Sequence, residues 1–429
     1  MSVVGAILVM ACLTILNYRF RRSVVYPPFV FCVVWLLDLF VFWLQPIPID
    51  QLHSVTLNLV VFGAVLFTLG GWASFLVPAS LFRRRFTIIG FPKGRGRILS
   101  WAIVAVLAIA LCLQFRYVVS LAGGAAGLGP GLLAAARNSI IENLSENSES
   151  MRLFTYVTTW SIFVALLFRL EKRRGAFRVA VAIAFVSAVL STGRGQILLL
   201  FAALSAIHLI RSHREGLGPA LRVVRWPLIG FAVLFVVLMF SNKQTDNLQV
   251  SAAAYIAQSV AGYLCGSVAA LDLVLRHPWV YVQGAALPST LRTLFTIAGA
   301  MRLMPYTAPP AFEAYVSVPF PINTFTLYKS FYMDYGLYGA VLMMSVIGFF
   351  HSLLYRKARM DSELGLFMFA VSMYPLIMVF FVDAYTSFAL YIHAFIFATA
   401  YMTLRSFRWG IFREAADDAV QRSQIGRVQ

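Results

Sequence analysis

The chain has 429 residues, of which 60% are hydrophobic and only 12% are charged. A mean hydropathy of +0.80 is far too high for a water-soluble domain of this length, so the composition excludes soluble enzymes and indicates an integral membrane protein. The formal net charge of +18 lies in short clusters of Lys and Arg at the ends of apolar runs. This placement is typical of topology signals and of contact with membrane lipid, and it argues against nucleic acid as a partner.

Apolar runs of about 15 to 25 residues recur along the chain, close to the roughly 20 helical residues that a bilayer core requires. They show no alternating pattern of the kind found in β-barrels. We therefore predict an all-α polytopic membrane protein, a bundle of about eleven transmembrane helices with a large late extracytoplasmic loop. The predicted spans are residues 3–16, 28–44, 54–77, 98–115, 154–170, 179–190, 197–210, 226–240, 337–354, 364–382 and 388–402.

The first run has no Lys or Arg before it and is followed by Arg19, Arg21 and Arg22. A cleaved signal peptide carries its positive charge in front, so we predict a retained first span with its N-terminus outside. An odd number of spans then leaves the C-terminus in the cytoplasm. This parity places most of the 35 Lys and Arg residues in inside loops, as the positive-inside rule requires.

The predicted chain divides into four parts. An N-terminal membrane bundle of about eight spans is followed by the large outside loop, three further spans and a cytoplasmic tail. Their boundaries are residues 1–240, 241–336, 337–404 and 405–429.

Two segments outside the predicted spans have alternative interpretations. The glycine-rich outside loop at 116–152 is either a flexible lid or a solvated connector. Residues 251–275 are apolar and compatible with a helix, but their polar side chains are poor lipid-facing material. We predict a helix that lies against the outer face or dips into the bundle.

Arg194 stands between two glycines where the chain is predicted to turn back towards the inside. If residues 179–210 formed one helix, the basic stretches on either side would lie on opposite faces of the membrane, so a turn at Ser191-Thr-Gly-Arg-Gly195 is favoured. A charge at membrane depth is costly unless it is paired or faces water. The guanidinium either binds diphosphate oxygens or snorkels to lipid phosphates.

The late loop carries more cations than its outside position requires, which indicates an anionic substrate or ordinary loop charge. Three titratable groups are candidates for acid–base work, although a lone loop histidine is usually structural. The aromatic residues near the end of the loop either stack on sugars or form an interfacial belt. The cations are Arg276, Arg292, Arg302 and Lys329, the acid–base candidates are His277, Glu313 and Asp334, and the candidate sugar-stacking tyrosines are Tyr328 and Tyr332.

Metal and cofactor chemistry has no support in the sequence. Cys12, Cys32 and Cys112 lie in apolar spans, and no cysteine spacing is typical of a metal site or a disulfide framework. The segment Gly94-Arg-Gly96 lacks the strand, turn and helix of a phosphate-binding loop. We expect no bound metal and no cofactor. Asp38, inside the second span, and Asp383, at the end of the tenth, are predicted to be paired within the bundle.

Two stretches resemble the O-antigen polymerase family, the oligosaccharide repeat-unit polymerases of bacterial envelopes that build lipopolysaccharide O-antigen and related surface polysaccharides. They are Leu190-Ser-Thr-Gly-Arg-Gly-Gln-Ile197 and Asn323-Thr-Phe-Thr-Leu-Tyr-Lys-Ser-Phe-Tyr-Met-Asp-Tyr-Gly-Leu-Tyr-Gly339. The layout of helices with one large late loop is also similar.

The resemblance implies a metal-independent glycosyltransferase at the outer face of the bacterial inner membrane. Its substrate would be an undecaprenyl-diphosphate-linked oligosaccharide, and a chain-length-regulating membrane protein would be an expected partner. By motif, Arg194 matches the mid-chain arginine, and Asn323, Tyr332, Asp334 and Gly336 match the late motif. Arg276 and Arg292 match only by their position in the loop.

Two other functions stay open at this point. An O-antigen ligase, which transfers finished polymer to a lipid acceptor, shares the leaving group and the membrane layout. A flippase or other transporter of lipid-linked oligosaccharide belongs to a different class. Neither an inverted repeat nor polar groups spread through the bilayer midplane support transport.

Overall fold

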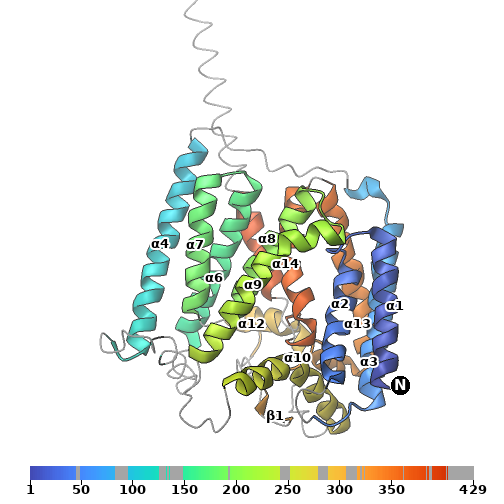
Figure 1. Ribbon diagram of the computed structural model, residues 1–429. Coiled ribbons are helices and arrows are strands. Elements are labelled where there is room, and N and C mark those ends of the chain that lie inside the picture. Colours follow the sequence, from blue (N-terminus) through green and yellow to red (C-terminus); the bar gives the residue numbers. More distant parts are fainter. Residues whose placement is uncertain are drawn as a thin grey trace, which may run out of the picture.

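The computed structural model describes residues 1–44, 49–82, 95–124, 148–191, 194–241, 252–278, 288–305, 316–318, 321–322, 324–360, 362–382, 384–385 and 389–401, together with residues 132, 135 and 403. Most of its helices run side by side as a bundle (Figure 1). Helices are expected for such a sequence, because a helix pairs its backbone N–H and C=O groups internally. Its faces can then all carry apolar side chains.

The first part of the chain forms helices connected by short turns. In chain order they are α1 (Val3–Arg21), α2 (Pro27–Trp43), α3 (Ser54–Ala73), the 3-10 turns η1 (Ser74–Leu76) and η2 (Ala79–Phe82), α4 (Arg95–Leu121), α6 (Ser148–Leu170), α7 (Arg174–Leu190), α8 (Arg194–Arg211) and α9 (Leu217–Ser241).

The later part contains shorter elements before the chain returns to long helices. These are α10 (Ala252–Arg276), η4 (Ser289–Leu291), α12 (Arg292–Ala300), α13 (Tyr328–Arg359), α14 (Glu363–Ile377), η5 (Met378–Phe380) and a final apolar helix, Ala389–Tyr401. Strands β1 (Val316–Ser317) and β2 (Pro321–Ile322) pair antiparallel, with Val316 opposite Ile322.

Five helices among the described residues are long and apolar enough to cross a membrane, which supports the predicted all-α membrane class. They cover Val3–Arg21, Ser54–Leu76, Ile98–Leu121, Tyr328–Arg359 and Glu363–Phe380. Shorter apolar helices lie at Pro27–Trp43, Thr155–Leu170, Gly195–Arg211 and Ala389–Tyr401. Each of the eleven predicted spans overlaps one of the helices of the structure.

The core of the bundle is built on close packing between α3 and α13. A Cβ atom at Gly70 would collide with the backbone of Ser345, and one at Gly348 would collide with the backbone of Phe67. Two small residues therefore let the helix backbones approach, as is common where membrane helices associate. Phe67 also stacks on Phe31 of α2, with ring centroids 4.1 Å apart.

Loops rich in basic residues meet at one end of the bundle. The buried carboxylate of Glu215, between α8 and α9, accepts hydrogen bonds from Ser23 Oγ at 2.5 Å and from Tyr355 Oη at 2.9 Å. Arg359 Nε, at the end of α13, lies 3.6 Å from the same carboxylate. Arg211 Nη1 donates to the carbonyl oxygen of Arg169 at 3.1 Å. Segments that the charge distribution placed on one side thus contact one another.

Helix α10 corresponds to the predicted helix at 251–275 and runs across the long helices at the opposite end of the bundle (Figure 1). Its residues Val268, Leu271 and Val274 have no exposed surface. The helix is therefore packed on the bundle along one side.

Helix α13 is interrupted near its beginning. Gly336 has φ 69° and ψ −173°, a conformation that side-chain-bearing residues avoid. The break separates a first segment, which ends at Tyr335, from the long apolar shaft that starts at Leu337, where the sequence predicted the ninth span to begin.

Candidate functional site

The predicted site residues fall into three groups, according to how much of each the structure describes. Glu313 and Asn323 lie outside the described residues, as does Asp383. Arg194 is the first residue of α8, and its backbone alone is described. The other eight predicted residues lie in or next to α10, α12 and α13: His277, Asp334, Arg276, Arg292, Arg302, Tyr328, Lys329 and Tyr332.

The Arg194 turn packs against α14. A Cβ atom at Gly195 would lie 2.5 Å from Tyr374 Oη, so any larger residue would force the tyrosine side chain or one of the two helices to shift. The next residue of α8 is also held, because Gln196 Oε1 accepts a hydrogen bond from Thr159 Oγ1 of α6 at 3.3 Å. The start of α8 is therefore packed against two neighbouring helices, and the contact with Tyr374 is made at Gly195, the residue after Arg194.

The late motif re-enters the bundle beside the same end of α14. Leu327 N donates to the carbonyl oxygen of Val379 in η5 at 3.0 Å. Ser267 Oγ of α10 lies 2.9 Å from Thr324 Oγ1 and donates to the carbonyl oxygen of Phe381 at 3.1 Å. The end of α14 and the segment after it thus contact the late motif, only a few residues beyond Tyr374.

Tyr328 is a core residue in this arrangement. It has no exposed surface, its hydroxyl donates to the carbonyl oxygen of Val60 at 3.3 Å, and its ring centroid lies 5.5 Å from that of Trp35. A Cβ atom at Gly63 would collide with its phenol ring. These contacts account for the tyrosine without a substrate, and we leave it out of the site proposed below.

Lys329 and Tyr332 follow on the first segment of α13. Lys329 Nζ lies 3.5 Å from the ring centroid of Phe325, a cation–π contact. Tyr332 is half-buried and packs against the apolar core.

Asp334 caps the short helical segment formed by η4 and α12. Its Oδ1 accepts from Ser289 N at 2.9 Å, and its Oδ2 accepts from Thr290 N at 2.8 Å. Ser289 Oγ lies within 3.1 Å of both carboxylate oxygens. Side-chain oxygens at a helix start satisfy backbone N–H groups that have no partner within the helix. Asp334 therefore connects the late loop to α13.

Arg276 is held at the end of α10. Its Nη2 lies 2.6 Å from Asp272 Oδ2 and donates to the carbonyl oxygen of Gln51 at 2.8 Å. Asp272 is buried, and its Oδ1 accepts from His53 N at 2.8 Å and from Thr56 Oγ1 at 2.5 Å. One carboxylate thus orders both the cation and the beginning of α3. The spacing of four residues between Asp272 and Arg276 on a helix is a signal for this pair.

The remaining cations of the late loop occupy surface positions. Arg292 opens α12 and is partly exposed, whereas His277 and Arg302 are exposed. Arg302 has a left-handed backbone, with φ 56°. These residues add positive charge to the end of the bundle that carries α10.

Asp38 and His351 are two of the titratable groups buried inside the bundle. Neither carboxylate oxygen of Asp38 has a hydrogen-bond partner within the described residues, so the pairing predicted for Asp38 is not seen there. His351 Nε2 lies 2.8 Å from Tyr385 Oη and 3.1 Å from Tyr391 Oη. The sequence did not mark His351, because a lone histidine in an apolar run carries no spacing signal.

No group of three or more His, Cys, Asp or Glu side chains placed to hold a metal ion occurs within the described part of the chain.

Comparison with known proteins identifies no relative of this chain. No protein family, no curated protein and no solved structure matches the chain. A functional assignment therefore rests on the residues and geometry described above.

Proposed function

We propose that this chain is a membrane glycosyltransferase that polymerises lipid-linked oligosaccharide repeats of a surface polysaccharide. A hydroxyl of the non-reducing sugar on a new repeat attacks the anomeric carbon of the growing chain. The bond from that carbon to the lipid diphosphate breaks, the diphosphate keeps the electron pair, and the hydroxyl proton passes to a base. The products are a chain longer by one repeat and a free lipid diphosphate.

One observation carries this proposal: the two sequence stretches with polar chemistry converge on the end of α14. Gly195, next to Arg194, contacts Tyr374, and Leu327 of the late motif is hydrogen-bonded to Val379. In this proposal, the cation expected to bind diphosphate lies next to Gly195 in the chain, and the loop expected to bind sugar ends near the same end of α14. If each stretch were only the end of a separate membrane span, the two stretches, which are distant in sequence, would not have to lie close together.

Arg194 supplies positive charge to the departing diphosphate in this proposal. It begins α8, where the N–H groups of the first turn and the helix dipole also favour an anion. A guanidinium adds a fork of donors that suits phosphate oxygens, and stabilising charge on a leaving group is a large term in such reactions.

The base near the acceptor hydroxyl is Glu313 or His277. Asp334 is a weaker candidate than the sequence implied, because its oxygens are occupied by donors from Ser289 and Thr290. Asn323, Tyr332 and Lys329 are proposed to contact the sugar.

The proposed topology has about eleven crossings, with the N-terminus outside and the C-terminus in the cytoplasm of a bacterial cell. The contacts of Glu215 and Arg211 gather basic loops at the end of the bundle opposite α10. This segregation supports a site on the periplasmic face.

The test is polymer formation by purified protein supplied with an undecaprenyl-diphosphate-linked repeat. Wild-type protein should give a ladder of products, with and without chelator. Replacing Arg194 by Ala or by Lys should abolish the ladder, because neither side chain offers a guanidinium fork. Arg222→Lys, an exposed change at the far end of the bundle, is the matched control. A full ladder from both Arg194 variants would overturn the assignment.

The same assay separates the two other functions. Attachment of finished polymer to a lipid acceptor without a change in length would indicate a ligase. Lipid-linked repeats that accumulate on the inner face of a deletion strain would indicate transport.

A further inference from the structure

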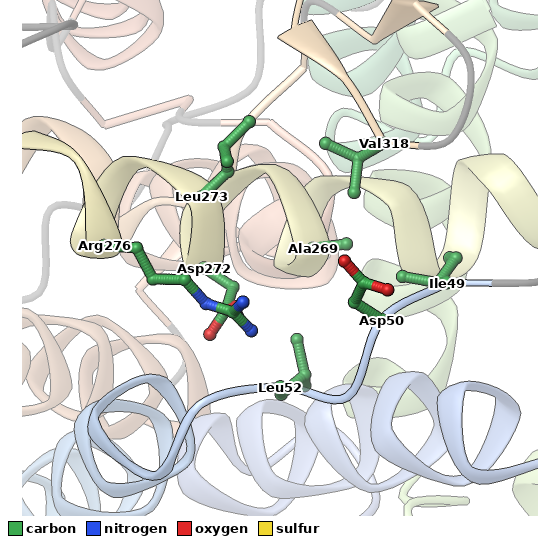
Figure 2. A pocket seen from close by; sticks show the side chains of 8 residues that line it. All are labelled: Ile49, Asp50, Leu52, Ala269, Asp272, Leu273, Arg276 and Val318. Carbon is green, nitrogen blue, oxygen red and sulfur yellow. The ribbon is translucent and has the colours of Figure 1, made fainter.

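A half-open recess lies between α10 and the connection from α2 to α3 (Figure 2). Its polar lining consists of Asp50, Asp272 and Arg276, and its apolar lining includes Leu52, Ala269 and Val318. Figure 2 shows Asp50, Leu52 and Arg276 directed into the gap between the connection and the helix. A few placed polar groups on apolar walls are typical of sites for small ligands, and the volume of about 40 Å³ admits only the edge of such a ligand.

Arg276 is immobilised in this recess before any ligand arrives. Its Nη2 is engaged by Asp272 at 2.6 Å and by the carbonyl oxygen of Gln51 at 2.8 Å. Among the described residues, the structure gives no partner for its Nε and Nη1. Because the side chain is already ordered, its remaining N–H groups bind a ligand without a further loss of rotamer entropy.

Asp50 supplies the opposite hydrogen-bonding character. Its side chain is exposed at the edge of the recess, and no hydrogen bond or ion pair is formed by its carboxylate within the described part of the chain. A carboxylate only accepts hydrogen bonds and a guanidinium only donates them. The two groups together can serve a hydroxyl, which donates to one and accepts from the other.

The balance of charge selects the class of ligand. Two carboxylates, Asp50 and Asp272, stand against one cation, Arg276, so the recess has a formal charge of one negative unit. A diphosphate would be repelled by the carboxylates, whereas an uncharged sugar bearing neighbouring hydroxyls would not. This balance of charge therefore argues that Arg276 does not bind the diphosphate, a role that was suggested only by its position in the loop.

We infer that this recess is a carbohydrate subsite, in which Asp50 accepts from and Arg276 donates to hydroxyls of one sugar of the oligosaccharide. The inference rests on the proposed function, because it places the acceptor repeat of that reaction. Its position, on α10 beside the re-entry of the late motif, puts the sugar at the end of the bundle that carries the late loop.

The test uses full-length protein in lipid nanodiscs and two variants with matched controls. Asp50→Asn removes the acceptor charge, and Asp50→Glu retains it. Arg276→Lys keeps a cation for Asp272 but replaces the planar fork of five N–H groups by one nitrogen, of whose three N–H groups two are needed for the contacts with Asp272 and Gln51. Arg222→Lys controls for the loss of a guanidinium elsewhere, and the thermal unfolding midpoint of each variant reports its folding.

The probe is the lipid-free oligosaccharide released by mild acid from the lipid-linked repeats of the source cells. Saturation-transfer NMR should detect its binding to wild-type protein and to Asp50→Glu. Asp50→Asn and Arg276→Lys should each weaken that binding about tenfold, as expected for loss of a charged hydrogen bond. Wild-type affinity in both of these variants, no binding to wild-type protein, or displacement by inorganic diphosphate would overturn the inference.

Polymerisation in the same nanodiscs distinguishes the two proposals. Asp50→Asn should raise the KM for the lipid-linked repeat about tenfold and change kcat by less than about twofold, because the subsite binds without touching the reacting atoms. If the wild-type protein gives a ladder and the KM of Asp50→Asn is unchanged, the subsite is excluded and the polymerase function is not. Absence of a wild-type ladder, with oligosaccharide binding that depends on Asp50, would remove the polymerase function alone.

Discussion

At the scale of single residues, hydrogen-bond geometry distinguishes residues that the sequence made equally good candidates for the site. Asp334 and Tyr328 belong to one motif, yet the first caps a helical segment and the second fills the core. Arg276 is paired with a carboxylate four residues before it on α10. In each case the contact partner, and not the residue type, distinguishes a structural role from a catalytic one.

Asp334 provides a test of that distinction. Replacing it by Ala leaves the N–H groups of Ser289 and Thr290 without their acceptors, which should lower the free energy of unfolding by about 1 to 2 kcal/mol. Asp334→Asn, which retains one acceptor oxygen, should cost less and should keep polymerising activity. Chemical unfolding and the polymer ladder measure the two effects. An inactive Asp334→Asn variant of unchanged stability would mean that Asp334 is the base.

At the scale of helices, the contact between α8 and α14 decides whether the Arg194 turn is held in place. Gly195→Ala places a methyl group 2.5 Å from Tyr374 Oη, so the tyrosine side chain or the two helices must shift. We expect a loss of about 1 to 3 kcal/mol in stability and a clear loss of activity. Tyr374→Phe removes the clashing oxygen and should restore much of both in the double variant. Thermal unfolding and polymer yield report the result, and no recovery in the double variant would contradict this packing argument.

Sequence patterns predicted the helices well and the contacts between them poorly. Long apolar runs determine α1, α3 and α13, because a helix surrounded by lipid needs no particular partner to be apolar. The contact of Gly195 with Tyr374 and the hydrogen bond from His53 N to Asp272 join residues that are distant in the chain. No local pattern encodes such pairs, so the convergence on α14 could not be predicted.

At the scale of the whole molecule, the two ends of the bundle should face different compartments. In a variant with its four cysteines replaced, a cysteine at Arg302 should react with a membrane-impermeant maleimide in intact spheroplasts, and one at Arg222 only after permeabilisation. Both side chains are exposed, so accessibility within the protein does not limit the reaction. Labelling of the cysteine at 222 in intact cells would contradict the proposed topology.

Asp272 takes part in two separate features of the structure. Its carboxylate accepts hydrogen bonds from His53 and Thr56 at the start of α3, and it neutralises Arg276 beside the recess. A substitution at Asp272 therefore removes in one step the acceptor of His53 N and Thr56 Oγ1 and the counter-ion of Arg276, and no single second change replaces both. We therefore expect positions 56, 272 and 276 to change together in homologous sequences. A sequence in which only one of the three has changed should be rare, because it would lose stability.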